Sequence, residues 1–165
     1  MSEMDAAERQ ALIARYKAGP AAVRAALAGA TEAELDARHD GWTAREVAHH
    51  LADSETMSAI RLRRLLAEDR PVIQGYDEEE FAHVLRYDRP IESALALLEA
   101  IHHNTGELLD RLKEADWARA GTHSESGRYA VTDWLRIYAA HAYDHADQIR
   151  RAISVARAAG GPNSC

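Results

Sequence analysis

The sequence predicts an all-α protein, an up-down four-helix bundle with short extra helices in its connections. Three observations favour this class. Helix-forming residues dominate the chain, Val, Ile and Thr never cluster as they would in a sheet, and long segments repeat apolar residues at helical spacing. Only residues 128–131 resemble a brief extended stretch. Four long helices with substantial connections are typical of a bundle.

The first helix is expected over about residues 5–18. Gly19-Pro20 interrupts this pattern, and proline at that point suits the first position of a second segment that ends near Gly29. Residues 31–34, Thr-Glu-Ala-Glu, form a capping-box pattern, in which a threonine side chain and a glutamate three residues later cap the same helix start. A short turn of helix is therefore expected there.

The next long helix starts at a second capping-box pattern, residues 43–46, and is expected to continue to about Glu68, before Pro71. Residues 77–85 are expected to form a short helix. The third long helix begins at Pro90. The connection between these long helices is long enough to cross an end of the bundle.

The last long helix is expected to begin at a cap on Thr132 and to end near Ala158, just before Gly160. A polar connection over residues 116–131 precedes it. The 165 residues fit one domain. We therefore expect a single metal-binding bundle domain over residues 1–159 and a frayed tail over 160–165.

The composition favours a soluble protein of the cytoplasm. The 20 basic and 27 acidic residues give a net charge of −7, which repels phosphate backbones, so we expect no nucleic-acid partner. No stretch approaches the ~18 continuous apolar residues of a membrane span, and the acidic N-terminus lacks a signal-peptide pattern. The sole cysteine, Cys165, excludes an internal disulfide and a multi-cysteine metal site.

Two of the nine histidines, His141 and His145, are four residues apart and share one face of the last helix. Chance alone predicts roughly half a pair at this spacing in such a chain, so a solvated or packed pair is the alternative. The helix face favours a metal site. Apolar and aromatic residues flank the pair at helical spacing, in the series Trp134, Tyr138, His141, His145, Ile149 and Ala152.

Histidines within such an apolar stripe need partners, because an unpaired buried polar group costs about 1–3 kcal/mol. One metal ion satisfies both rings. His50 lies on the inward stripe of the second long helix and is the expected third ligand, whereas His49 points about 100° away. Ser54 and Ser58 on the same stripe either leave space for substrate or water, or pack against a bulky neighbour.

Three neutral imidazoles leave an open coordination position, which is typical of catalytic metal sites. The expected cofactor is one divalent ion, and zinc, nickel, iron and manganese all accept such ligands. Arg61, Ser54 and Tyr138 are candidate substrate-binding residues, with Arg61 suited to a carboxylate.

Several other polar residues are weaker candidates. Tyr76 and Tyr143 either orient substrate or pack, and Asp53, Asp144 and Asp147 either support the imidazoles or form surface salt bridges. We expect the remaining histidines without partners at ligand spacing to lie on the surface: His39, His83, His102, His103 and His123.

Four segments in order carry a resemblance to a known family. They are residues 42–55 (WTAREVAHHLADSE), 60–63 (IRLR), 75–78 (GYDE) and 138–145 (YAAHAYDH). Together they resemble the DinB-like superfamily, and within it the branch of YfiT-type metal-dependent hydrolases, which is related to the bacillithiol S-transferases.

This resemblance implies an up-down four-helix bundle and a metal held by His50, His141 and His145. It also implies that a homodimer is possible. The chain departs from the family pattern at Glu55 and Asp144, where YfiT-type members carry histidine.

The leading functional hypothesis is a metal-dependent thiol S-transferase of the bacillithiol or mycothiol type, acting in detoxification. The metal would hold the thiol of a small cosubstrate as thiolate for attack on an electrophilic substrate. One alternative is a hydrolase that uses metal-bound hydroxide. Another is a non-catalytic metal- or ligand-binding stress protein.

Overall fold

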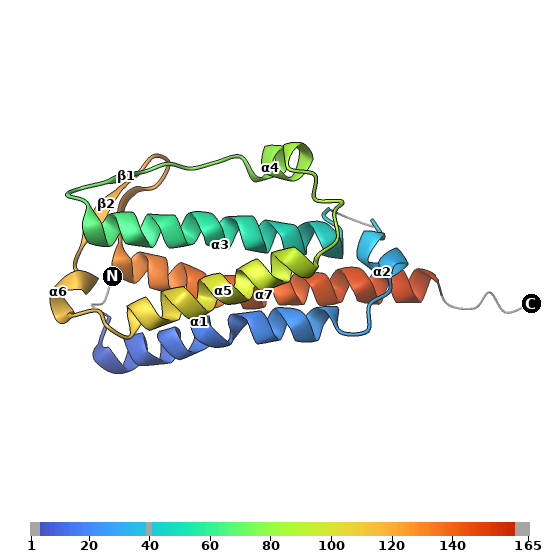
Figure 1. Ribbon diagram of the computed structural model, residues 1–165, viewed down its shortest axis with the longest axis horizontal. Helices are drawn as coiled ribbons and strands as arrows, with labels where there is room; N and C mark the ends of the chain where they lie inside the picture. Colours follow the sequence, from blue (N-terminus) through green and yellow to red (C-terminus); the bar gives the residue numbers. More distant parts are fainter. Residues whose placement is uncertain (1–3, 39–40, 161–165) are drawn as a thin grey trace, which may run out of the picture.

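The computed structural model describes residues 4–38 and 41–160 and confirms the four-helix bundle. The long helices, shown in Figure 1, are α1 (Ala6–Leu27), α3 (Ala44–Ala67), α5 (Glu92–Leu109) and α7 (Val131–Ala159). Of the expected tail, residues 161–165 lie outside the described part. None of the described helices has the length and apolarity of a membrane span.

The helices form a ring in which α1 packs on α7 and α5, and α3 packs on the same two helices. Figure 1 shows α1 and α7 running in one direction and α3 and α5 in the other. The connection from α3 to α5 therefore returns along the whole bundle, over α3, instead of crossing one end as expected. It carries the short helix α4 (Glu78–Val84).

Small elements close the two ends of the bundle. The short helix α2 (Glu32–Asp36) packs at one end, and α6 (Glu114–Trp117) at the other. A three-stranded sheet holds β1 (Val72–Ile73) parallel to β2 (Ala120–His123), and β2 antiparallel to β3 (Gly127–Ala130). The expected extended stretch is thus confirmed, and it pairs as part of a sheet.

Two of the helix starts follow the capping patterns of the sequence, and a third does not. The capping boxes at Thr31 and Thr43 are both present. The cap expected at Thr132 is wrong, since α7 begins at Val131 directly after strand β3. The backbone N–H of Ala130 donates instead to Asp133 at 2.9 Å.

The expected interruption at Gly19-Pro20 is also wrong, because α1 continues through Pro20. Proline lacks the N–H that would donate to the carbonyl oxygen four residues earlier, that of Tyr16. That oxygen accepts a hydrogen bond from His102 Nδ1 at 2.8 Å instead. Gly19 permits the close approach of α1 to α7, since a Cβ at this position would lie 2.8 Å from the Cβ of Ala142 on α7.

Two apolar clusters fill the core, one towards each end. The cluster near α2 includes Val23, Leu27, Val47, Leu51, Leu95, Leu98 and Ile149. The cluster near α6 and the sheet includes Tyr16, Leu62, Leu65, Leu109, Val131 and Trp134. Between them along α3, α5 and α7 lie buried polar residues: His50, Ser54, Glu55, Ser58, His102 and Thr105, with His141 beside them. The core is therefore divided by a polar layer.

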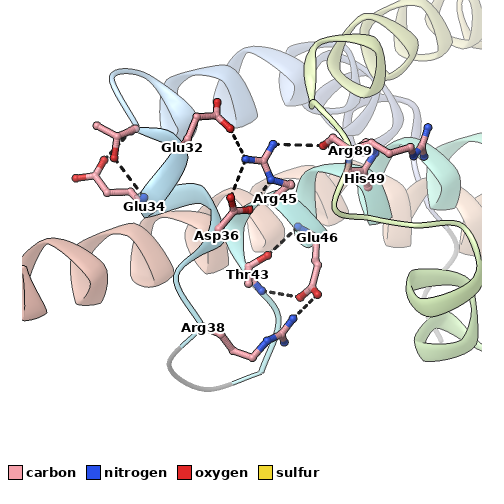
Figure 2. A network of polar contacts seen from close by, with 10 residues as sticks. Glu32, Glu34, Asp36, Arg38, Thr43, Arg45, Glu46, His49 and Arg89 are labelled. Carbon is pink, nitrogen blue, oxygen red and sulfur yellow. Dashed lines mark hydrogen bonds and ion pairs between the residues drawn. The ribbon is translucent and has the colours of Figure 1, made fainter.

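A separate polar network fastens the start of α3 to its neighbours. Figure 2 shows the Arg45 guanidinium reaching Glu32, Asp36 and the backbone oxygen of Arg89. Arg45 is 5% exposed, and its Nε lies 2.5 Å from Asp36 Oδ1. His49 Nε2 donates to the same Arg89 oxygen at 2.9 Å. This network joins α2, α3 and the segment before α5.

Candidate metal centre

The structure brings His50, His141 and His145 together. One ring nitrogen of each lies within 4.8 Å of the others. The ring centroid of His145 lies 4.7 Å from that of His50 and 4.6 Å from that of His141. Within residues 4–38 and 41–160 this is the one group of three or more histidine, cysteine or acidic residues with this geometry. The spatial convergence expected from the helix faces is therefore present.

Hydrogen bonds set which nitrogen of the two α7 rings faces the centre. His141 Nδ1 donates to Glu55 Oε1 at 2.9 Å, and His145 Nδ1 donates to Gln148 Oε1 at 2.8 Å. A neutral imidazole protonated at Nδ1 carries its lone pair on Nε2. Both rings can therefore present Nε2 to one ion.

The environment also favours the neutral form of two of the imidazoles, as metal binding requires. Burial, with the nearby His145 and His141, lowers the pKa of His50 to about 3. Burial and the neighbouring His141 lower the pKa of His145 as well. The residues present thus fit a divalent metal ion in donor type and spacing.

Glu55 is the functional candidate that the sequence reasoning missed. Its side chain is fully buried, and one carboxylate oxygen accepts the hydrogen bond from His141. Burial raises the pKa of this carboxyl, but the nearby His102 and the hydrogen bond from His141 lower it by more. A sequence signal existed, because Glu55 stands between Leu51 and Ser58 at steps of four and three on the inward stripe.

The expectation that His102 lies on the surface is wrong, since it is 1% exposed. It continues the apolar stripe of α5 at a step of four from Leu98, which is the signal that reveals its position. His103 and His83 are exposed, as expected, and His123 is half-buried. His39 lies outside the described residues.

The three candidate substrate-binding residues occupy the side of the centre towards the sheet. Tyr138 lies edge-on to His141, with ring centroids 5.5 Å apart. Its hydroxyl accepts a hydrogen bond from Arg61 Nη1 at 3.2 Å, and Arg61 Nη2 donates to the backbone oxygen of Gln74 at 3.0 Å. Ser54 is buried. Their role as substrate contacts stays a prediction.

The alternatives left open for several residues are now decided. Ser58 is fully buried, its hydroxyl donates to Glu55 Oε2 at 3.4 Å, and its backbone oxygen accepts from Trp134 Nε1 at 2.9 Å. Tyr143 packs under the guanidinium of Arg15. Asp53 accepts a hydrogen bond from Tyr87 at 2.7 Å, and Asp147 forms a surface salt bridge with Arg150. None of these contacts involves the three imidazoles.

Comparison with known proteins agrees with this architecture. The sequence model of one protein family, the DinB superfamily, matches residues 15–149 of this chain. The chain therefore belongs to this superfamily. Within it the chain is similar to proteins named "Putative metal-dependent hydrolase". One from Oceanobacillus iheyensis is 44% identical over 108 residues, which are 66% of this chain and 63% of that protein. Another, from Geobacillus thermodenitrificans, is 35% identical over 144 residues, covering 83% of this chain and 79% of the relative.

A solved structure is similar over almost the whole chain. YfiT from Bacillus subtilis, described as "a probable metal-dependent hydrolase with an unusual four-helix bundle topology", superimposes with a TM-score of 0.86 at 27% identity. The match covers 98% of this chain and 92% of YfiT. The resemblance to YfiT-type proteins is thereby confirmed.

Proposed function

We propose that this protein is a metal-dependent hydrolase whose divalent ion is held by His50, His141 and His145. The observation that carries the proposal is the convergence of three imidazoles from two helices, with one ring nitrogen of each within 4.8 Å of the others. A ligand set of this kind leaves a coordination position open, which is typical of catalytic sites. The names of the relatives support the same class.

When bound, the ion would supply Lewis acidity and activate water near neutral pH. Tyr138 is suited to orient the substrate. Burial above all raises its pKa to about 12, so its hydroxyl keeps its proton at neutral pH. Because that oxygen accepts from Arg61, its own O–H is available to a substrate oxygen.

Arg61 is suited to bind an anionic group of the substrate, with Ser54 nearby on the same helix face. Its guanidinium lies over the ring of Tyr76, 5.6 Å from the ring centroid. Its Nε is buried and has no hydrogen-bond partner in the described part of the chain. This leaves a donor for a carboxylate or phosphate oxygen.

A thiol S-transferase of the bacillithiol or mycothiol type is the second candidate, and the position of Glu55 favours it. Both oxygens of this carboxylate face protein groups, so Glu55 is not free to act as a general base towards water. A small-molecule thiol needs no such base, because it ionises far more readily than water. Its partner would be an electrophilic substrate.

The experiment measures metal content and two activities of the purified protein. Apoprotein is loaded with zinc, nickel, iron or manganese, then assayed on p-nitrophenyl esters and phosphodiesters without thiol. A parallel assay uses monochlorobimane with bacillithiol or mycothiol. The hydrolase proposal expects ester or phosphodiester cleavage that requires metal, is lost in His50→Ala and persists in His103→Ala.

Other outcomes decide among the alternatives. Conjugation of the thiol to monochlorobimane, without cleavage of the esters or phosphodiesters, would contradict the hydrolase proposal and support the thiol S-transferase. Stoichiometric metal without turnover in either assay would indicate a non-catalytic binding protein. Absence of metal binding by the wild-type protein would contradict all three proposed functions.

A further inference from the structure

A chain of polar groups crosses the core and takes one member from each long helix. The carbonyl oxygen of Tyr16 on α1 accepts from His102 Nδ1 on α5 at 2.8 Å. His102 Nε2 lies 3.5 Å from Glu55 Oε2 on α3. Glu55 Oε1 accepts from His141 Nδ1 on α7 at 2.9 Å. The chain thus ends on a proposed metal ligand.

The first contact depends on the proline within α1. In an uninterrupted helix the Tyr16 carbonyl would accept the N–H of residue 20, which proline lacks. The free acceptor is used by His102 Nδ1, and the ring of Tyr16 stacks on the same imidazole at 4.1 Å between centroids. Both contacts fix the plane of the His102 ring.

The middle contact, 3.5 Å between His102 Nε2 and Glu55 Oε2, is too long for a good N–H···O hydrogen bond. His102 Nε2 has no other partner among the described residues. Glu55 is fully buried, and a buried carboxylate is tolerated only where other groups compensate its charge. Its Oε1 accepts from His141, whereas its Oε2 faces His102 and accepts from the Ser58 hydroxyl at 3.4 Å.

We propose that Glu55 and His102 are positioning residues of the metal centre. Glu55 holds His141 in the tautomer protonated at Nδ1 and in the orientation that points Nε2 at the ion, and His102 holds Glu55. The inference rests on the proposed function, because it takes His141 as a metal ligand. A carboxylate behind a ligating imidazole also raises the basicity of the ligand nitrogen.

The decisive variant is Glu55→Gln, which retains size and removes the charge. Metal affinity is measured by calorimetry on apoprotein titrated with Zn²⁺, and the site geometry by the visible spectrum of the Co²⁺ form. Loss of such a partner typically weakens metal binding about 10–100-fold. We expect a loss of at least about tenfold and a changed Co²⁺ spectrum. Affinity within twofold of wild type with an unchanged spectrum overturns the proposal.

His102→Asn tests the outer end of the chain and serves where Glu55→Gln does not fold. Its side-chain amide keeps the position of Nδ1 and the bond to Tyr16, but loses the contact with Glu55. We expect a several-fold loss of Zn²⁺ affinity. The matched control is His103→Asn, the next residue on α5, whose side chain is 81% exposed and whose substitution should leave affinity unchanged. Equal affinity of both variants contradicts a positioning role for His102.

A measurement on the wild-type apoprotein separates this inference from the proposed function. Two-bond ¹H–¹⁵N correlation spectra report the tautomer of each neutral histidine. We expect His141 protonated at Nδ1, and a changed tautomer population in Glu55→Gln. A wild-type His141 protonated at Nε2 overturns the positioning role even if metal binds. Failure of the wild type to bind metal overturns the proposed function whatever the tautomer.

Discussion

Two buried polar regions on the same helix, α3, differ in how their groups are satisfied. Around Arg45, at the start of the helix, donors meet protein acceptors, and the acidic partners Glu32 and Asp36 keep 80% and 58% of their side chains exposed to water. Near the middle of α3 and across to α7, three imidazoles face one another. The first arrangement is complete within the protein, whereas the second brings together three side chains whose ring nitrogens can all bind one cation.

The contrast is sharpest in two neighbouring residues. His49 and His50 are both 2% exposed. His49 donates to the Arg89 oxygen and stacks on Tyr87, so its role is structural. His50 faces His141 and His145 instead, and their proximity, added to burial, lowers its pKa. Burial of a polar side chain therefore indicates a binding site only when its partners are not found in the protein.

The strongest test of this comparison is the removal of one imidazole. In His141→Ala we expect metal content, measured by elemental analysis, to fall from about one ion per chain to near zero. The free energy of unfolding of the apoprotein should also fall, because the substitution removes the hydrogen bond that His141 donates to the buried carboxylate of Glu55. His103→Ala is the control. Retention of metal in His141→Ala contradicts the site assignment.

The pH dependence of apoprotein stability should reveal the same centre. In the unfolded chain histidine titrates near pH 6.5, whereas folded His50 titrates at about 3. Between these values the unfolded chain binds more protons, so the free energy of unfolding falls as pH falls. Each such histidine contributes a slope of about 1.4 kcal/mol per pH unit.

Denaturant unfolding of metal-free protein between pH 7 and 5 measures this slope. His50→Ala should have a shallower slope than wild type, and His103→Ala the same slope as wild type. Identical slopes for wild type and His50→Ala would show that folding does not lower the pKa of His50.

The Arg45 network should respond in the opposite way. Arg45→Met removes charge-assisted hydrogen bonds at a 5% exposed site but leaves its acidic partners in water. We expect a loss of about 2 kcal/mol in the free energy of unfolding and unchanged Zn²⁺ affinity. Arg38→Met, which loses an exposed pair with Glu46, should change stability by less than about 0.5 kcal/mol. A fall in metal affinity of Arg45→Met would contradict the separation of the two regions.

The smallest effect concerns the proline in α1. Pro20→Ala restores an N–H that competes with His102 for the Tyr16 carbonyl. Because a carbonyl oxygen has two lone pairs, we expect only a two- to threefold loss of Zn²⁺ affinity by calorimetry. The same substitution in the His102→Asn background, where the contact with Glu55 is already lost, should have no further effect. An equal loss in both backgrounds would mean that Pro20 acts by another route.

Most helices and the faces that they bury can be predicted from the sequence. The capping boxes at Thr31 and Thr43 and the inward positions of His50 and His141 follow from local hydrogen bonding and helical periodicity, both of which depend on residues close in the chain. The sequence also places three histidines on the two stripes of α3 and α7 that face the core of the bundle. The resemblance of four segments to a known family then identified the superfamily.

Tertiary structure decided which polar groups meet. Pro20 sits within a continuous helix because His102, on another helix, takes the acceptor that proline leaves free. Glu55 and His102 are buried because each compensates a group more than 40 residues away along the chain. The physical reason is that a charged side chain is stable in a core only where other groups compensate its charge. When those groups lie on separate helices, the spacing of residues along the chain does not reveal them.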